Sequence, residues 1–461
     1  MRPARAAPAG RRADRHADRR AAAGPRQRRR AQRLRLSERR LQDWLAWMET
    51  LHPREIDLGL ERVREVAARM GLERMAFPIL TVGGTNGKGS TVAMLEAILR
   101  AAGYRTGAYT SPHLIDYNER VCIDGASVDD GALCAAFERI EAARGPVSLT
   151  YFEFGTLAAV ELFRGARLDV AVLEVGMGGR LDAVNVWDAD AAVVASVGID
   201  HVQWLGPDRE AIGREKAGIF RPGRPAIVGD PDPPASLVEH AERIGAQLLR
   251  VGREFGFERG QDGWTFRAGA RLRAGLPYPA LRGDFQLYNA AGALMALDAV
   301  AARLPVDQGQ VRAGLLGMRL AGRFQTLPGR PLRVLDVAHN VPAAAALAAT
   351  LRQQPVAGRT VAVLGMLKDK PIAEVAAQLA PLVDGWHVAT LDVARGARSA
   401  ELAAALRAAG VTAPIREFAD VTDAYRAAEA AAGVDDRILV FGSFYTVGGI
   451  LAQLAPSAGG R

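Results

Sequence analysis

The sequence predicts an α/β protein with a large domain built on a mainly parallel sheet and a smaller C-terminal α/β domain. Three observations predict this fold class: the length of 461 residues, the alternation of short apolar runs with amphipathic segments, and a glycine-rich loop between a strand and a helix. A chain of this length exceeds what one hydrophobic core usually supports. Strands that alternate with helices form mainly parallel sheets with helices on both faces.

Residues 1–36 differ in composition from the rest of the chain. They hold 13 arginines against Asp14 and Asp18, a net charge of +11, so the remaining residues carry −3 of the total of +8. They contain no Phe, Trp, Tyr or β-branched residue. Because such a segment cannot bury enough apolar surface to stay ordered, we predict a disordered leader over residues 1–36. An arm that binds nucleic acid and a targeting peptide are the alternative readings.

Composition elsewhere is that of a cytoplasmic globular protein. Hydrophobic residues make up 49% of the chain, yet no apolar run approaches the roughly 20 residues that a membrane-spanning helix needs. Cys122 and Cys134 are the only cysteines. They cannot form a disulfide framework, which suits a reducing compartment.

The first domain is predicted to begin with two helices. Leu41, Trp44, Leu45 and Met48 share one helical face, and residues 58–70 repeat the 3.6-residue period. Apolar runs then predict strands at 79–82, 108–110, 168–175, 191–197, 226–228 and 248–251. Amphipathic segments predict helices at 91–102, 129–143, 152–163 and 208–219.

The second half of the chain shows a change of pattern. Residues 255–278 are rich in Gly and aromatics and predict short antiparallel strands, and a helix is predicted at 290–302. Residues 318–330 lose periodicity, so we place the domain linker there and the boundary between residues 320 and 321. A second βαβ series predicts strands at 332–337, 361–364, 385–391 and 437–441.

A phosphate-binding loop follows the strand at 79–82. Glycines let backbone N–H groups turn toward an anion, the following helix N-terminus adds positive potential, and Lys88 can reach the β- and γ-phosphates. The residues expected to bind ATP here are Gly84, Thr85, Asn86, Gly87, Lys88, Gly89 and Ser90. The common phosphate loop has Ser or Thr directly after the Lys to hold Mg²⁺, whereas this chain has Gly89.

This loop resembles that of the folylpolyglutamate synthases, a branch of the Mur-ligase superfamily, and the resemblance covers residues 37–461. The matching motifs are 84–90, 110–114, 173–182, 198–201, 212–220, 284–291, 322–325 and 335–340. Segments 365–370 and 441–445 also resemble the family, without an expected catalytic role. The resemblance implies a Mur-ligase-like fold, with residues 37–320 as the ATP-binding phosphate-loop domain and 321–461 as the C-terminal ligase domain.

The resemblance also implies two Mg²⁺ ions, held by Ser111, Glu174 and His201. Glu174 ends a buried strand, where α/β sheets bind ligands, and a carboxylate suits a hard cation. A lone histidine such as His201 is in general more often structural than a ligand. Lys216 lies in a segment whose lysine is carbamylated in relatives, so the expected catalytic residues are Lys88, Lys216 and His201.

Three further residues are expected to bind ATP. Asn289 matches the adenine-binding amide of the family, although a helix N-cap is the alternative role. Arg323 matches the arginine that reaches the ATP phosphates, which its planar fork suits. Asp336 is expected to face the ribose.

Phe152, Glu153, Asp182 and His339 are expected to contact the other substrate. Phe152 and Phe154 could pack against a pterin or benzoyl ring, or could belong to the core. Residues 51–60 and 149–156 most resemble bacterial family members with both folylpolyglutamate synthase and dihydrofolate synthase activity.

The expected function is ATP-dependent ligation of L-glutamate to dihydropteroate and to folylpolyglutamates through an acyl phosphate. The expected partners are small molecules, with no membrane and no nucleic acid, and the chain is expected to act as a monomer. Two alternatives stay open: a Mur-type amino-acid ligase of cell-wall precursors, and a nucleotide-dependent binding module whose basic leader contacts nucleic acid.

Overall fold

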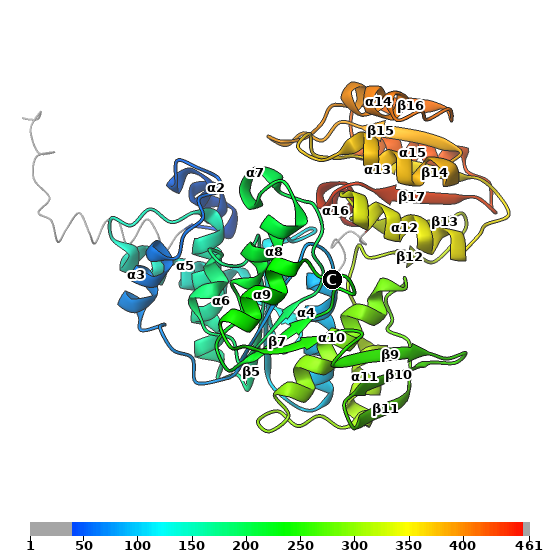
Figure 1. Cartoon of the computed structure of the whole chain (residues 1–461). Coiled ribbons are helices and arrows are strands. Elements are labelled where there is room, and N and C mark those ends of the chain that lie inside the picture. Colours follow the sequence, from blue (N-terminus) through cyan, green and yellow to red (C-terminus); the bar gives the residue numbers. More distant parts are fainter. Residues whose placement is uncertain (1–38, 455–461) are drawn as a thin grey trace, which may run out of the picture.

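The computed structural model describes residues 39–454, so the predicted leader at 1–36 lies outside the described residues. Figure 1 shows two α/β bodies, one drawn from blue to green and one from yellow to red, with the green strands β9–β11 beside the first. The expected arrangement of a large sheet domain and a smaller C-terminal α/β domain is confirmed.

The large sheet has eight strands in the order β4-β3-β2-β5-β1-β6-β7-β8. Its parallel strands are β1 (Ile79–Gly83), β2 (Thr106–Tyr109), β5 (Val170–Glu174), β6 (Ala191–Val194), β7 (Pro225–Val228) and β8 (Gln247–Arg250). At one end of the sheet, β3 (Val121–Ile123) and β4 (Ala126–Ser127) are antiparallel. Every residue of β1 and β5 is buried, as expected for strands covered on both faces. Strands β3 and β4 were not predicted because runs of two or three residues show no alternation.

Helices cover both faces of this sheet. One face packs on α4 (Lys88–Ala101), α10 (Phe285–Ala299) and α11 (Gln308–Gly317). The other packs on α2 (Leu41–Leu51), α3 (Glu61–Met70), α5 (Asp130–Arg144), α6 (Tyr151–Ala166), α8 (Arg209–Ala217) and α9 (Ala235–Arg243). Short helical turns are η1 (Tyr117–Arg120), η2 (Ala183–Val186) and α7 (Val202–Leu205).

Helix α10 begins five residues earlier than predicted, at Phe285 with Asp284 as its N-cap. Asn289 therefore lies in the second turn, and the N-cap alternative for this residue is wrong. The apolar periodicity misplaced the start because Gln286 and Asn289 are polar yet buried, so the first turn does not look like an apolar stripe.

The predicted antiparallel strands are β9 (Phe255–Arg259), β10 (Trp264–Ala268) and β11 (Arg271–Leu276), which form a separate sheet. Trp264 and Phe266 bury their rings in the core that α4, α10 and α11 share. This small sheet therefore belongs to the same packing unit as the phosphate-loop helix.

The C-terminal sheet has the order β12-β13-β17-β14-β15-β16. Its strands are β12 (Gln325–Leu327), β13 (Leu332–Asp336), β14 (Thr360–Leu364), β15 (Gly385–Ala389), β16 (Ile415–Phe418) and β17 (Arg437–Phe441), of which β12 alone is antiparallel. Helices α12 (Val341–Gln353), α13 (Ile372–Leu379) and α14 (Ser399–Ala408), with the turn η3 (Ala380–Leu382), cover one face. Helices α15 (Val421–Ala431) and α16 (Phe444–Leu454) cover the other.

Two strands of this sheet were not predicted. Strand β12 lies inside the segment 318–330 that lost periodicity, and it pairs through three residues with β13. Strand β16 is a partly exposed edge strand. Both lack the continuous burial that makes a strand visible in sequence.

Within residues 39–454, no helix combines the length and the apolarity needed to cross a membrane.

Candidate active site between the two sheets

A cavity of about 620 Å³ lies where the two α/β bodies meet. The ends of β1, β5 and β6 reach it from the large sheet, and the end of β13 reaches it from the C-terminal sheet. Ligands bind at the carboxyl ends of strands in open α/β sheets, so this is the expected place for a site.

The phosphate loop is fixed to the segment that follows β6. Thr85 Oγ1 donates to the Gly198 carbonyl at 3.0 Å, and the Asn86 backbone N–H donates to Ser196 Oγ at 3.0 Å. Gly87 has a φ of 85°, and a Cβ there would come within 2.3 Å of Asn289 Oδ1. Glycine is therefore required at this position on both conformational and steric grounds.

Lys88 begins α4 and bends back over its own loop. Its Nζ donates to the carbonyls of Gly84 at 3.1 Å and Thr85 at 3.2 Å. Desolvation lowers its pKa, while Glu174 and Asp200 act in the opposite direction. The ammonium group is thus held by neutral carbonyls at the wall of the cavity.

Gly89 lets two charged groups approach the start of α4. A Cβ on Gly89 would lie 3.7 Å from Glu174 Oε2 and 3.8 Å from Arg323 Nη2. A longer side chain would enter the space between this carboxylate and this guanidinium, which explains the glycine after Lys88. Arg323 comes from the C-terminal body, where its guanidinium carbon lies 5.1 Å from the Phe444 ring centroid.

Glu174 and Ser111 lie together. Glu174 Oε2 accepts the backbone N–H of Ser111 at 3.3 Å, and burial raises the pKa of this carboxyl. His201 has a left-handed backbone, with a φ of 51°. Burial lowers the pKa of its ring to about 4, so the ring is neutral at pH 7 and carries a nitrogen lone pair that can bind a metal.

The three expected metal ligands do not form a protein cage. Among residues 39–454, no group of three or more His, Cys, Asp or Glu side chains is placed to hold a metal ion. Mg²⁺ is usually held by one or two carboxylates together with substrate phosphates and waters. A single buried carboxylate beside the phosphate loop fits that mode.

Lys216 on α8 lines the cavity with a side chain that is only 3% exposed. Desolvation, helped by Lys88, lowers the pKa of its amine to about 7. A large fraction of this amine is therefore neutral at physiological pH.

Asn289 and Asp336 each make contacts within the protein. Asn289 Nδ2 donates to Gln286 Oε1 at 2.9 Å, and its Oδ1 faces Gly87. Asp336 accepts the backbone N–H groups of Phe324 and Ala338, both at 2.8 Å. Both residues line the cavity.

The expected substrate residues also line the cavity, with different partners. The Phe152 ring lies over Gly176, where a Cβ would come within 2.6 Å of it. Asp182 accepts the backbone N–H groups of Met177 at 2.9 Å and Val184 at 3.1 Å, and burial raises its pKa to about 6. Its carboxylate therefore holds the loop that follows β5.

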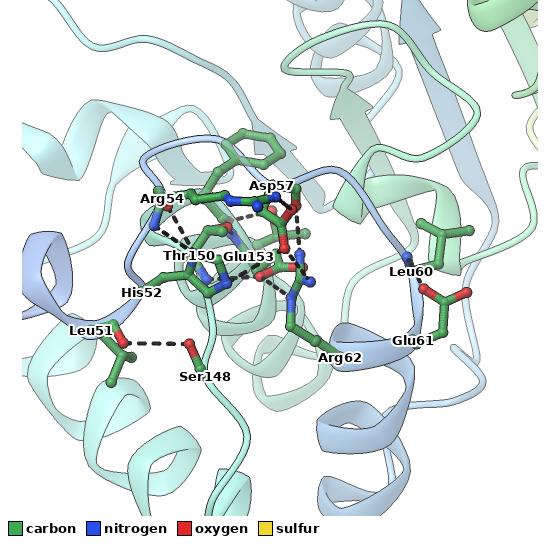
Figure 2. Close-up of polar contacts among 12 residues, drawn as sticks. Leu51, His52, Arg54, Asp57, Leu60, Glu61, Arg62, Ser148, Thr150 and Glu153 are labelled. Atoms are coloured by element: carbon green, nitrogen blue, oxygen red, sulfur yellow. Dashed lines mark hydrogen bonds and ion pairs between the residues drawn. The ribbon is translucent and has the colours of Figure 1, made fainter. Parts of the chain in front are cut away.

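Residues 51–60, which we call the strap, are tied to the N-terminus of α6 (Figure 2). Arg62 Nη1 binds Asp57 Oδ2 at 2.6 Å, and Arg62 Nη2 lies 3.0 Å from Glu153 Oε1. Glu153 Oε2 also accepts the Thr150 backbone N–H at 2.7 Å. Both oxygens of Glu153 are thus engaged within the protein, and this residue holds the strap and caps α6.

Sequence reasoning missed a cluster that joins the two bodies. Asp200 Oδ1 accepts Lys370 Nζ at 2.6 Å, and Asp200 Oδ2 accepts Asn340 Nδ2 at 3.0 Å. His339 Nε2 lies 3.7 Å from Asp200 Oδ2. Burial alone would raise the pKa of Asp200, but His201, Lys370 and His339 hold it well below its usual range. The signals were an Asp beside His201 at a strand end and a Lys in the family-like segment 365–370.

Two family models match the chain. One, described as the Mur ligase middle domain, matches residues 82–297, and one described as the Mur ligase glutamate ligase domain matches residues 322–444. The chain is 46% identical to a dihydrofolate synthase/folylpolyglutamate synthase of Escherichia coli, over 91% of this chain and 97% of that protein. It is 40% identical to a dihydrofolate synthase/folylpolyglutamate synthase of Haemophilus influenzae, over 88% of this chain and 96% of that protein.

Solved structures give the same result. E. coli FolC in complex with DHPP and ADP is 46% identical, with a TM-score of 0.86 over 91% of this chain and 98% of that one. A bifunctional folylpolyglutamate synthase/dihydrofolate synthase with Mn, AMPPNP and L-glutamate bound is 47% identical, with a TM-score of 0.84 over 91% and 99%.

Proposed function

The chain belongs to the dihydrofolate synthase/folylpolyglutamate synthase family of the Mur-ligase superfamily, and from this membership we propose which residues carry out its reaction. It is an ATP-dependent ligase that adds glutamate in folate synthesis. The relatives favour this activity over the cell-wall alternative. It uses ATP and a divalent metal ion and acts on small-molecule substrates.

The observation that carries the assignment is the convergence of Lys88, Glu174 and Arg323 around the phosphate loop. Lys88 and Glu174 come from the large sheet domain and Arg323 from the C-terminal body. Both charged groups beside Gly89 lie within ordinary contact distance of its Cβ position. Glu174 and Arg323 flank the start of α4, which Lys88 begins, so two cations and one carboxylate lie around the phosphate loop, as transfer of a γ-phosphoryl group requires.

A carboxylate is a poor acyl donor, so the reaction must begin by activating it. Transfer of the γ-phosphoryl group of ATP to the folate carboxylate forms an acyl phosphate and releases ADP. The amine of glutamate then attacks the acyl carbon, the amide bond forms and phosphate leaves. Lys88 and Arg323 stabilise the charge that develops on the transferred group. Asn289 and Asp336 line the nucleotide end and are proposed to contact adenine and ribose.

We assign one Mg²⁺ to Glu174 and Ser111 and a second to His201. The buried Glu174 carboxylate and the neutral His201 ring support this assignment. Bound there, the ions would neutralise phosphate charge.

Lys216 is proposed to be carbamylated. Because its pKa is about 7, its neutral amine is available to attack CO₂, forming an N–C bond and releasing a proton. The carbamate replaces a buried cation with an anion near Lys88, which removes a repulsion between two like charges. It would also attract a divalent cation.

One active site is proposed to serve both dihydropteroate and folylpolyglutamates. Both reactions activate a carboxylate at the end of a pterin-containing substrate and use the same amine. Phe152 and His339 line the cavity with groups suited to substrate contact, whereas Glu153 and Asp182 hold the surrounding backbone. The chain is proposed to act as a monomer, and light scattering tests this.

The test is to supply purified protein with ATP, L-glutamate and either dihydropteroate or a reduced folate, and to measure ADP and amide product. Both substrates are expected to give amide. Product from only one of them contradicts dual activity, and no product from either contradicts the proposed function. Phe152→Ala is expected to reduce the two activities unequally. Removal of residues 1–36 is expected to leave both unchanged, whereas the binding-module reading predicts loss of function.

A further inference from the structure

We propose that Asp200, Asn340 and Lys370 form an interdomain latch that keeps water away from the acyl phosphate, a role that rests on the proposed function. These are positioning residues, since they act through the two bodies that surround the substrate.

The latch is a buried ion pair with an added amide. Asp200 follows β6 in the large sheet domain, whereas Lys370 follows β14 in the C-terminal body. The two side chains are 10% and 6% exposed, and Lys370 Nζ lies 2.6 Å from Asp200 Oδ1. A second interdomain pair, Arg395 with Glu55 at 3.6 Å, is 37% and 70% exposed. Exposed pairs contribute little, so of these two interdomain ion pairs the buried one constrains the contact more.

Asn340 joins this pair to the phosphate loop. Its Nδ2 donates to Asn86 Oδ1 at 3.1 Å and to Asp200 Oδ2 at 3.0 Å, and its Oδ1 accepts Asn86 Nδ2 at 3.1 Å. The same Oδ1 caps α12 by accepting the Ala343 N–H at 3.0 Å. One buried side chain therefore connects the phosphate loop, Asp200 and a helix that lines the cavity.

The consequence concerns the fate of the acyl phosphate. Water that reaches it cleaves it to the carboxylate and phosphate, so ATP is consumed without an amide bond forming. Closure of two bodies around a site excludes such water. The ratio of ADP released to amide formed therefore measures how well the latch excludes water from the acyl phosphate.

Two variants test it with the full-length protein. Asn340→Asp keeps an oxygen that caps α12 but places a second oxygen against Asn86 Oδ1 and Asp200 Oδ2, where a donor is needed. Lys370→Met keeps the apolar stem and removes the ammonium group. For both, we expect the ratio of ADP to amide to rise at least about twofold and amide turnover to fall about tenfold, with the KM for ATP within about threefold of wild type.

Matched controls separate the latch from general damage. Asp420→Asn makes the reverse isosteric change at the N-cap of α15, where Asp420 accepts the Asp423 N–H at 2.9 Å. Arg395→Ala removes the exposed interdomain pair. Both controls are expected to form one amide per ADP, and melting temperatures check that every variant folds.

Three results would overturn the latch. The first is a ratio of ADP to amide of one in both variants, and the second is a loss of amide that follows the melting temperature alone. The third is a change confined to the KM for glutamate, which would make Lys370 a substrate ligand. A wild-type protein that forms no amide with any substrate overturns the proposed function as well.

Discussion

The phosphate loop and the strap both line the cavity, but they hold charged side chains in different ways. At the strap, Asp57 is paired with Arg62 of α3, which also pairs with Glu153 (Figure 2). Around the phosphate loop, Lys88 contacts backbone carbonyls. Within residues 39–454, neither Lys88 nor Lys216 forms an ion pair with a side chain.

This difference separates structural charges from charges available to ligands. Despite partial burial, Glu153 and Asp57 raise the pKa of Arg62, whereas desolvation lowers the pKa of Lys88 and of Lys216. A buried charge without an opposite partner costs free energy of folding. That cost is offset when an anion such as a nucleotide phosphate binds.

The largest expected effect concerns Lys88, a charge without an ion-pair partner. Lys88→Ala is expected to lower turnover about 10²–10³-fold, because one partner of the transferred phosphoryl group is lost. Its melting temperature is expected to stay at or above that of wild type, since no ion pair is broken. Lys368→Ala, an exposed lysine in the C-terminal body, is the control. Near-normal turnover of Lys88→Ala would show that this ammonium is not held for ATP.

Lys216→Ala is expected to lose about 10–100-fold in turnover, the scale for groups that support a metal site. A small added carboxylate should restore part of it by replacing the carbamate. ¹³C-bicarbonate should label wild type at Lys216, visible by NMR, and should leave Lys216→Ala unlabelled. A fully active Ala variant, or unlabelled wild type, argues against carbamylation.

The pH dependence at Lys216 has a definite sign. The pKa of Lys216 is about 7 in the folded protein and ordinarily 10.5. Between pH 7 and pH 10.5, Lys216 therefore binds more protons in the unfolded chain than in the folded protein. The stability of unmodified protein should therefore rise with pH across this window. In buffer low in CO₂, carbamate and activity should fall as pH drops below 7, because the neutral amine disappears. Urea titrations from pH 6 to 9 check the change in stability, and rate profiles over the same range check the change in activity. Lys216→Met is the control for both measurements.

Arg62→Ala tests the charges that are held in ion pairs. It leaves the buried Glu153 without its cation and is expected to lower the free energy of unfolding by about 1–3 kcal/mol. The KM for the pterin substrate should rise because the strap loosens, while the KM for ATP should stay near wild type. Arg64→Ala on the exposed face of the same helix should change neither. Equal increases in both KM values would mean that the strap does not act on one substrate alone.

The smallest expected effect belongs to Thr150→Ala. Thr150 Oγ1 accepts the Glu153 N–H at 3.3 Å as the N-cap of α6. Losing the cap should lower stability by about 1 kcal/mol, measured by chemical denaturation, with little change in turnover. A loss of activity larger than that of Arg62→Ala would place Thr150 in the site itself.

Much of the fold was predictable because it depends on local patterns. The phosphate loop lies between β1 and α4 because a buried run, four glycines around Lys88 and an amphipathic segment follow one another in the chain. Glu174 ends β5 for the same reason. The failures were also local: β4 and β12 are too short to show alternation, and the polar first turn of α10 concealed its start. The roles of Lys88, Glu174, His201 and Lys216 stay predictions.

The sequence by itself determined most of the longer strands and helices, because backbone periodicity and glycine conformation act over a few residues. Only the tertiary structure decided which charges meet. Arg62 and Glu153 are 91 positions apart, Asp200 and Lys370 are 170 apart, and Asn86 and Asn340 are 254 apart. Ion pairing and desolvation depend on distances of a few ångströms and on burial. The strap contacts and the low pKa of Lys216 therefore exist only once the large sheet domain is packed, and the contacts of Asp200 with Lys370 and Asn340 only once the two bodies meet.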